Sequence, residues 1–314
     1  MDKPIRSLHH VTATVSDAQD DLDFYTGLLG QRLVKKTVNF DNTRVFHFYY
    51  GDEKGTPGTI MTTFPYAHLG VRKGTHGAGQ ITVTSFSVPA GSLPFWRRRL
   101  ATAGVSFTDE GSGFGEEVLR FRDPSGLTIR LVENRADARA PWVKEDIDER
   151  TALRGIHGVS LMVRDPKETL AFMSDLMDTA VVGETEGAMR VAVSGDAAGR
   201  LVDIVTAGDA PQAVNGSGTV HHVAFAVDDP EQQLEMRREL LRRGVSVTEV
   251  MDRQYFRSIY FREPGGVLFE VATIPPGFTA DEGLRELGTS LKLPPWEEAN
   301  RSAIEAGLPA VTPS

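Results

Sequence analysis

The chain contains no cysteine among its 314 residues. Disulfide bonds, thiolate nucleophiles, zinc fingers and cysteine-ligated iron–sulfur clusters are therefore excluded. No apolar run approaches the roughly 18 residues that a membrane-spanning helix needs, and residues 1–7 lack the apolar core of a signal peptide. We therefore expect a cytoplasmic protein that has no membrane partner. A formal net charge of -9 also argues against a nucleic-acid partner, because nucleic-acid binders concentrate positive charge.

The overall composition is ordinary for a folded protein. Hydrophobic residues make up 40% of the chain and charged residues 25%, a balance that argues against disorder. Because domains usually contain about 100–200 residues, the length predicts two domains, or one domain built from repeats.

A short apolar strand recurs four times along the chain. The four segments are HVTATV, VTSFSV, GVSLMV and HVAFAV, which end at Val15, Val88, Val163 and Val227. Successive end points are separated by 73, 75 and 64 residues. Each segment precedes a stretch with apolar residues at three-to-four spacing, which indicates an amphipathic helix. Asp17, Asp165 and Asp228 lie where they would cap three of these helices.

Longer signatures indicate a duplication of the chain. FRDPSGL at 121–127 and FREPGGV at 261–267 are offset by 140 residues, and Val88 and Val227 are offset by 139. Each unit reads as strand–helix–strand–strand–strand, so we predict an α+β fold of four βαβββ modules. The predicted modules 1 to 4 are residues 1–78, 79–150, 151–215 and 216–274. Domains are then expected at 1–150 (modules 1 and 2) and 151–274 (modules 3 and 4), with a C-terminal tail at 275–314.

Comparison of the four modules picks out a metal site. Five residues before the last valine of the recurring strand, only modules 1 and 4 carry histidine, namely His10 and His222. The last strand of module 4 contains Glu270 within VLFEVAT. A carboxylate in such an apolar run is costly unless it is paired or bound to a metal. Two histidines and one carboxylate form a facial set that suits non-haem Fe(II) and leaves other metal positions open.

The same comparison predicts how the modules pair into two curved mixed-sheet half-barrels. The positions equivalent to Glu270 are Thr62, Arg130 and Asp203 in modules 1, 2 and 3. A cavity between modules 1 and 4 would hold the complete set of ligands. We therefore expect modules 1 and 4 to pair, and modules 2 and 3 to pair around a metal-free cavity that contains an Arg130–Asp203 ion pair.

The other histidines are weaker candidates. His47, in VFHFYY, is interpreted as a strand residue and not as a ligand. His68 and His76 lie in a predicted loop. His157 aligns with His9, which precedes the predicted ligand His10, so a structural role is expected for His157.

Four long segments carry a family resemblance. They are LHHVTATVSDAQDDLDFYTGLLGQRLVKKTVNFD, FHFYYGDEKGTPGTIMTTFPY, GTVHHVAFAV and DRQYFRSIYFREPGGVLFEVAT. Together with four βαβββ modules and one His–His–Glu set, they resemble the vicinal oxygen chelate superfamily, and within it the branch of hydroquinone-cleaving dioxygenases. The resemblance covers about residues 5–300.

This resemblance implies a ring-cleaving dioxygenase whose small aromatic substrate is a para-hydroquinone and whose second substrate is O2. It implies Fe(II), with Mn(II) as an alternative metal, at His10, His222 and Glu270. The catalytic residues implied around the metal are His9, Thr12, His221, Arg253 and Tyr260.

Physical chemistry suggests roles for these neighbours. Thr12 shares the strand face of His10 and could hydrogen-bond a substrate oxygen. Arg253 would stabilise a phenolate or peroxide anion, with a surface salt bridge as the alternative. Tyr260 could donate to substrate or oxygen, or be a core tyrosine. His9 and His221 alternate away from the ligands, so we expect them to orient the site or act in acid–base chemistry. Strict alternation speaks against direct contact with the substrate, which only twist or a bend at the strand start would allow.

Two other function classes remain open. One is a glyoxalase- or epimerase-type metal lyase or isomerase, in which the metal is only a Lewis acid. Such sites commonly use one more protein ligand, and Thr62 offers none. The other is a metal-free binding or resistance protein, in which loss of the histidines would be expected. The ring substituents of the substrate, the choice between iron and manganese and the formation of a homo-oligomer are not decided by the sequence.

Overall fold

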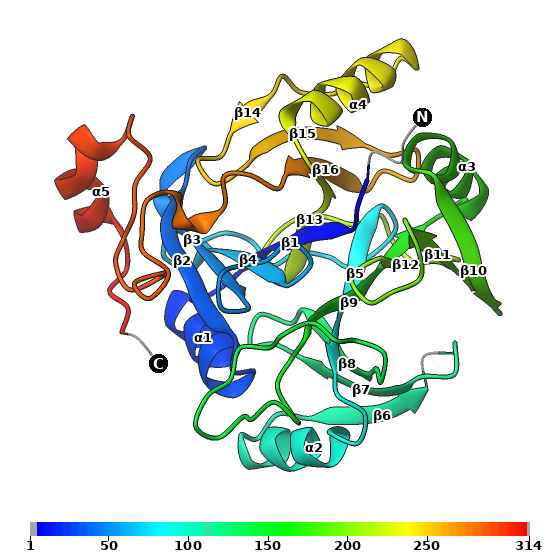
Figure 1. Cartoon of the computed structure of the whole chain (residues 1–314), viewed down its shortest axis with the longest axis horizontal. Helices are drawn as coiled ribbons and strands as arrows, with labels where there is room; N and C mark the ends of the chain where they lie inside the picture. Colours follow the sequence, from blue (N-terminus) through cyan, green and yellow to red (C-terminus); the bar gives the residue numbers. More distant parts are fainter. Residues whose placement is uncertain (1–4, 112, 313–314) are drawn as a thin grey trace.

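The computed structural model describes residues 5–111 and 113–312 and contains two eight-stranded mixed sheets (Figure 1). The order of the first sheet is β14 (Met251–Asp252), β15 (Arg257–Arg262), β16 (Leu268–Thr273), β13 (Thr219–Val227), β1 (Leu8–Val15), β4 (Ile60–Pro65), β3 (Asn42–Gly51) and β2 (Arg32–Asn39). The order of the second sheet is β10 (Thr179–Thr185), β11 (Ala188–Val193), β12 (Leu201–Thr206), β9 (Gly155–Val163), β5 (Gln80–Val88), β8 (Thr128–Glu133), β7 (Glu117–Arg122) and β6 (Phe107–Gly111).

The sheet order confirms the predicted fold class and the pairing of the modules. The first sheet combines the strands of modules 1 and 4, and the second combines those of modules 2 and 3. Within each sheet the recurring first strands of the two modules meet as antiparallel neighbours, β1 with β13 and β5 with β9. Each of these strands also pairs in parallel with the last strand of its own module. The assignment of 1–150 and 151–274 as domains stays a prediction.

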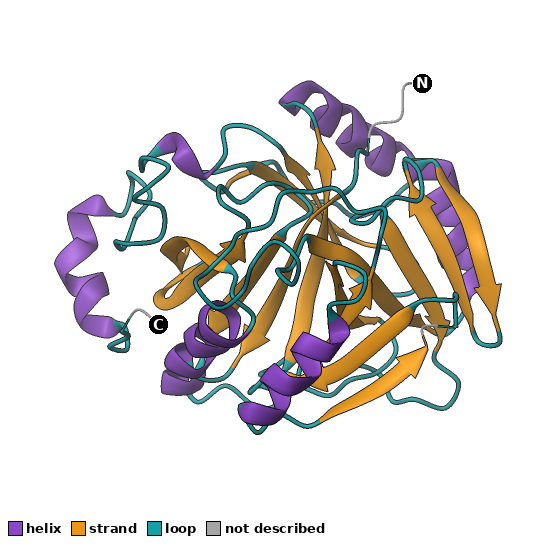
Figure 2. Cartoon of the chain, turned by 60° about the horizontal axis from the view of Figure 1, so that its bottom comes forward, coloured by secondary structure: helices purple, strands orange, loops and turns teal. Residues whose placement is uncertain are grey.

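Helices cover the outside of the sheets (Figure 2). They are α1 (Ala18–Leu22), which continues as a π-helical turn over Asp23–Leu28, α2 (Leu93–Thr102), α3 (Pro166–Met177), α4 (Pro230–Arg242) and α5 (Arg301–Gly307), with 3-10 turns at Ala67–Leu69, Phe278–Ala280 and Glu298–Asn300. None of the helices in the described ranges is long and apolar enough to cross a membrane.

Side-chain caps fix where these helices begin. Asp17 and Asp165 accept hydrogen bonds from the first turns of α1 and α3, as predicted. The predicted cap Asp228 is wrong, because α4 begins at Pro230 and Asp229 therefore occupies the capping position. Asp228 forms an ion pair with Arg6 instead, at 2.5 Å.

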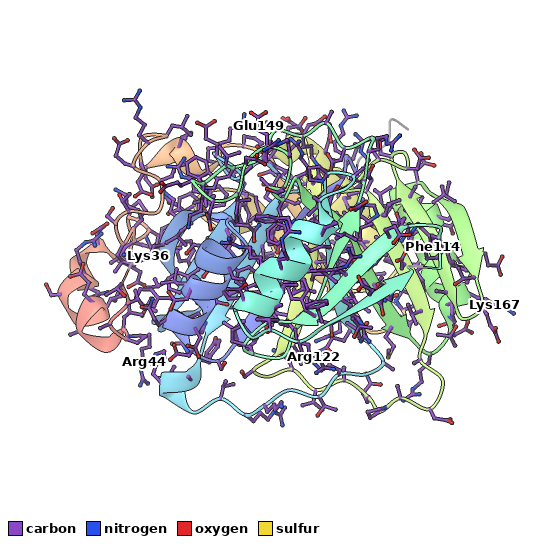
Figure 3. The ribbon with its side chains drawn as sticks, turned by 90° about the horizontal axis from the view of Figure 1, so that it is seen from below. Lys36, Arg44, Phe114, Arg122, Glu149 and Lys167 are labelled. Carbon is purple, nitrogen blue, oxygen red and sulfur yellow. The ribbon has the colours of Figure 1, made fainter. Side chains whose placement is uncertain are left out.

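Inward-facing residues of α1 to α4 and alternating strand residues form the main hydrophobic core between the layers. In α2 this face comprises Leu93, Trp96 and Leu100, all of them buried. The long axis of the molecule runs from module 1 to module 3, and Figure 3 shows Lys36 of β2 and Lys167 of α3 toward opposite ends.

The pairing of β1 with β13 is interrupted at two symmetry-related points. Leu8 and His10 lie opposite consecutive residues of β13, so His9 has no partner in the ladder. On the other strand, His222 and Val220 lie opposite consecutive residues of β1, so His221 has no partner. Such bulges re-aim side chains and break strict alternation. They occur at the two histidine pairs singled out by the sequence.

The predicted Arg130–Asp203 ion pair is wrong. Arg130 Nε lies 2.8 Å from Glu110 Oε1, and Asp203 Oδ1 lies 2.7 Å from Arg190 Nε. Arg190 is opposite Asp203 in the β11–β12 ladder, so an arginine of the same module neutralises this carboxylate. Glu110 lies on β6, two strands from β8, and Arg190 lies on β11, next to β12, so both ion-pair partners come from other strands of the same module.

The C-terminal tail runs beside the edge strand β2, at the end of the molecule coloured red in Figure 1. The backbone N–H of Lys292 donates to the carbonyl of Lys36 at 2.9 Å. The completely buried Lys35 forms ion pairs with Asp281, at 2.6 Å, and with Glu282. The tail therefore supplies both hydrogen bonds and counter-charges to β2.

Candidate metal centre and its cavity

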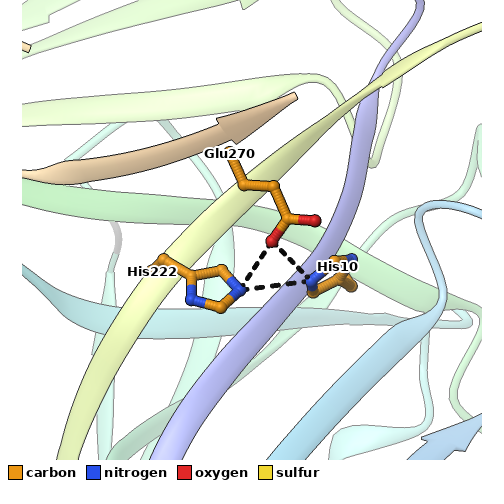
Figure 4. Close-up of side chains that lie close together, drawn as sticks. All are labelled: His10, His222 and Glu270. Carbon is orange, nitrogen blue, oxygen red and sulfur yellow. Dashed lines mark hydrogen bonds and ion pairs between the residues drawn. The ribbon is translucent and has the colours of Figure 1, made fainter. Parts of the chain in front are cut away.

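His10, His222 and Glu270 converge from three adjacent strands, β1, β13 and β16 (Figure 4). Glu270 Oε2 lies 2.8 Å from His222 Nε2 and 3.3 Å from His10 Nε2. The two Nε2 atoms are 3.3 Å apart. All three side chains are buried, Glu270 completely. The structure thus brings together the three residues that the sequence predicts as ligands.

The arrangement fits a metal ion. Ligand atoms at bond lengths near 2.1 Å and right angles would lie about 3 Å apart, which agrees with the spacing of these three atoms. Although two imidazole nitrogens face it, Glu270 Oε2 is buried without a hydrogen bond of ordinary geometry. A buried unpaired carboxylate oxygen is costly. No other cluster of three or more His, Asp or Glu side chains within the described ranges has suitable geometry for a metal.

Each candidate ligand histidine is supported by the histidine that precedes it. His9 Nδ1 lies 2.9 Å from His10 Nδ1, and His221 Nδ1 lies 2.7 Å from His222 Nδ1. If Nε2 of a ligand faces the metal, its Nδ1–H is free to donate to the neighbouring ring, which fixes the tautomer and the ring orientation. Burial is the main cause that lowers the pKa of His9 and of His221 to about 3, so both rings are neutral acceptors near pH 7.

Glu270 is held as a carboxylate. Burial alone would raise its pKa, but the adjacent His10 and His222 outweigh this effect and hold the pKa well below its usual range. The second oxygen, Oε1, accepts a hydrogen bond from the hydroxyl of Ser258 at 2.5 Å. Ser258 lies on β15, the strand next to β16. Oε2 is therefore left facing the two imidazoles.

A cavity of about 380 Å³ opens next to the three candidate ligands, a size within the usual range of small-molecule sites. Its lining residues are His10, Thr12, Thr14, Asn39, Phe40, Asp41, His47, Tyr49, Phe64, Tyr66, Val71, Asn215, Gly216, His221, His222, Arg253, Phe256 and Tyr260. Aromatic rings make up a large share of this wall, and polar groups are placed among them.

Four of the five predicted catalytic residues line this cavity. They are Thr12, His221, Arg253 and Tyr260, whereas His9 is packed behind His10 against the ring of Phe256. His221 reaches the cavity despite strict alternation, and the bulge in β13 at this residue is the kind of strand irregularity that the sequence argument left as the exception.

Arg253 lines the cavity and also forms the salt bridge that the sequence offered as the alternative, while its role in stabilising an anion stays a prediction. Its guanidinium forms an ion pair with Asp41, with Nη2 3.0 Å from Oδ2. Nε donates to the hydroxyl of Tyr260 at 3.2 Å. Burial raises the pKa of Tyr260 above its usual value. The hydroxyl of Tyr260 therefore keeps its proton, with Arg253 fixing the position of the oxygen.

His47 and Tyr49 are among the residues of the cavity wall that sequence reasoning missed. Both lie on β3, as the strand interpretation of His47 expected, but both also line the cavity. His47 Nε2 lies 2.7 Å from Thr62 Oγ1, and the Tyr49 hydroxyl lies 2.9 Å from His47 Nδ1. The available signal was alternation, since His47 and Tyr49 share the strand face that meets Thr62.

The remaining histidines lie elsewhere in the structure. His68 Nε2 lies 2.7 Å from the carbonyl of Arg44. His157 belongs to the second sheet, where its Nε2 lies 2.8 Å from Glu116 Oε1.

Comparisons with known proteins are consistent with this site. The sequence profile of the Glyoxalase/Bleomycin resistance protein/Dioxygenase superfamily matches residues 7–131 and 155–271. The chain is 44% identical over 302 residues to "Putative ring-cleaving dioxygenase MhqE" of Bacillus subtilis, covering 96% of this chain and 98% of that protein. It is 36% identical over 308 residues to the "Chlorohydroquinone/hydroquinone 1,2-dioxygenase" of Sphingobium indicum, covering 96% and 95%.

Solved structures agree with the sequence relatives. The crystal structure of a "putative dioxygenase" from Bacillus subtilis superposes with a TM-score of 0.95 at 40% identity and 99% coverage of both chains. Glyoxalase I from Zea mays shares the fold, with a TM-score of 0.63 at 14% identity, covering 90% of this chain and 95% of that one. The chain therefore belongs to the Glyoxalase/Bleomycin resistance protein/Dioxygenase superfamily.

Proposed function

We propose that the chain is an Fe(II)-dependent ring-cleaving dioxygenase that adds O2 to a hydroquinone-type aromatic. His10, His222 and Glu270 would hold the iron. The observation that carries this proposal is the facial set of three ligand atoms beside a cavity lined by aromatic rings. The names of the full-length relatives support a ring-cleaving dioxygenase, and one of them names hydroquinone as the substrate.

A redox-active metal suits this chemistry. Iron, when bound, would supply a path for electrons between the aromatic ring and O2, which zinc cannot do. Mn(II) accepts the same ligands and is the alternative metal. Both atoms of O2 would enter the product while one ring carbon–carbon bond next to a hydroxylated carbon breaks. The reaction therefore needs no further reductant.

The residues around the cavity would bind and polarise the substrate. Thr12 would hydrogen-bond a substrate oxygen, and Arg253 would stabilise negative charge on it. Tyr260, whose oxygen accepts from Arg253, can direct its own proton toward the substrate. His9 and His221 would fix the tautomers of the ligand histidines through their Nδ1 contacts. Because His221 also lines the cavity, it is the histidine proposed to hold or move a proton there.

The position equivalent to Glu270 in module 1 favours an oxygenase over a lyase or isomerase. Thr62 occupies that position, and its hydroxyl is engaged with His47 and with Thr12. A fourth protein ligand is therefore missing from this side of the metal site, which leaves room for two exchangeable groups.

The test is O2 uptake by anaerobically purified protein loaded with Fe(II), given hydroquinone and then methyl- and chlorohydroquinone. Uptake is expected with at least one of these substrates and is expected to disappear in His10→Ala. The same protein loaded with Zn(II) is the matched control for redox chemistry. Absence of uptake despite one bound metal per chain would favour the lyase or isomerase class. Failure to bind any metal would favour a binding protein.

A further inference from the structure

The cavity wall contains two equivalent arrangements on opposite sides of the metal site. In module 4, Tyr260 of β15 lies opposite Glu270 of β16, and Ser258, two residues before Tyr260, donates to Glu270. In module 1, Tyr49 of β3 lies opposite Thr62 of β4. His47 stands two residues before Tyr49, as Ser258 stands before Tyr260.

The module 1 arrangement forms a continuous chain of hydrogen bonds. The hydroxyl of Tyr49 lies 2.9 Å from His47 Nδ1, and His47 Nε2 lies 2.7 Å from Thr62 Oγ1. Thr62 Oγ1 in turn donates to Thr12 Oγ1 at 3.1 Å. Thr12 and Thr62 are neighbours in the parallel β1–β4 ladder and are completely buried. Tyr49 and Thr12, the first and last residues of this chain of hydrogen bonds, both line the cavity.

The chain of hydrogen bonds has one consistent direction from donor to acceptor. Burial is the main cause that lowers the pKa of His47 well below its usual value, so the ring is neutral and carries a single N–H. Because Thr62 gives its proton to Thr12, its oxygen accepts from His47 Nε2–H. His47 Nδ1 is then an acceptor for the Tyr49 hydroxyl. Among the described residues, the Thr12 hydroxyl proton has no acceptor.

On the basis of the proposed function, we propose that His47 is a positioning residue. Through Thr62, and with Tyr49 fixing its tautomer, it holds the Thr12 hydroxyl as a hydrogen-bond donor to a hydroquinone oxygen. A donor whose orientation is fixed in advance costs no reorganisation when the substrate binds. His47 thereby acts on the substrate through Thr12, and the module 1 side of the cavity becomes a substrate-orienting wall opposite the metal carboxylate.

The direction of the hydrogen bonds from Tyr49 to Thr12 is tested without any substrate. In protein labelled with 15N-histidine, long-range 1H–15N correlation spectra report which nitrogen of each neutral imidazole carries the proton. The His47 signals are identified by their loss in His47→Gln. We expect a proton on Nε2 and none on Nδ1. A proton on Nδ1 would overturn the proposal, because Thr62 would then donate to His47 and the Thr12 hydroxyl would be turned away from the substrate.

The coupling to Thr12 is tested by anaerobic calorimetry of hydroquinone binding to the metal-loaded protein. His47→Leu and Thr12→Val are each expected to weaken binding about tenfold, the effect of losing one hydrogen bond. The double variant is expected to be no weaker than Thr12→Val alone. His47→Gln, which can still present an N–H to Thr62, is expected to recover most of the affinity. Multiplicative losses in the double variant would overturn the proposal.

Three experimental results distinguish a failure of this inference from a failure of the proposed function. Unchanged metal content in the His47 variants shows that the triad is intact. Hydroquinone binding by the wild-type protein without O2 uptake would contradict the dioxygenase proposal. The binding affinities of the single and double variants would then still test the role of His47. A wild-type protein that binds none of hydroquinone, methylhydroquinone and chlorohydroquinone would overturn both.

Discussion

Thr62 on β4 holds the place in module 1 that Glu270 holds on β16 in module 4. Each lies opposite a tyrosine of the preceding strand, Tyr49 or Tyr260. Each also receives a contact from the residue two positions before that tyrosine. Duplication thus produced two equivalent positions around one cavity, of which one carries a candidate metal ligand and the other a hydroxyl. This asymmetry explains how one site can both hold a metal and leave coordination positions open.

A carboxylate at position 62 is expected to convert the three-ligand metal site into a site with four protein ligands. In Thr62→Glu, a fourth protein ligand would compete with the substrates for the metal, so O2 uptake should fall more than about a hundredfold while the metal is bound at least as tightly. Thr62→Val, which breaks the hydrogen-bond chain without adding a ligand, is the control and should lower activity only about tenfold. Equal activity and metal affinity in the two variants would contradict the assigned geometry.

Removal of the Glu270 charge is expected to weaken metal binding. Glu270→Gln keeps the size of the side chain but should weaken Fe(II) affinity by more than about a hundredfold, since neutral amides are poorer ligands than carboxylates. Metal content after dialysis measures the effect. The matched control is Asp203→Asn, which changes the equivalent position in module 3, and this variant should keep its metal. Loss of metal in both variants would indicate a general effect on folding.

Much of this site could be predicted because the four repeated modules of the chain can be compared with one another. Equivalent positions in the four modules separated His10 and His222 from ordinary strand residues, and the presence of both in modules 1 and 4 predicted the sheet pairing. The confirmed element order follows from strand and helix periodicity, which local sequence encodes directly.

The failures concern features that depend on neighbours in space. The bulge at His221, which lines the cavity, is an irregularity of strand pairing that strict alternation cannot anticipate. The ion pairs of Arg130 and Asp203 depend on Glu110 of β6, two strands away from β8, and on Arg190 of β11, the strand next to β12. The local sequence of His47 indicates only a strand residue, because its contact with Thr62 depends on the neighbouring strand β4.

Arg253 is expected to act on the substrate and not on the metal. Arg253→Gln should lower kcat/KM by about tenfold to a hundredfold, because the charge beside the substrate oxygen is lost, and should leave metal content unchanged. Asp41→Asn, which removes only the ion-pair partner of Arg253, should have a smaller effect. If Arg253→Gln lost metal together with activity, the arginine would instead be supporting the metal centre.

Asp21 predicts a pH dependence of stability that is separate from the active site. This buried carboxyl accepts from Tyr50 at 2.7 Å and from Thr63 at 2.5 Å, and burial is the main cause that raises its pKa from 3.8 to about 8. The folded state therefore keeps a proton that the unfolded state releases near pH 4. Between about pH 4 and pH 8, the free energy of unfolding should decline as pH rises, by at most about 1.4 kcal/mol per pH unit.

Asp21→Asn removes this titration, so its stability should decline less across the same range. Denaturant unfolding of both proteins at pH 5 and pH 8 measures the difference. The variant should gain stability relative to the wild-type protein at pH 8. An identical decline in both proteins would show that Asp21 is not the group responsible.

The central claim is that the chain cleaves an aromatic ring with O2, and the stoichiometry of that reaction tests it most directly. With the Fe(II)-loaded protein, we predict that one O2 is consumed for each hydroquinone lost, with disappearance of the aromatic absorbance and a ring-opened acid as product. Formation of benzoquinone and hydrogen peroxide in place of that acid would show that the protein oxidises the ring without cleaving it, and would contradict the account.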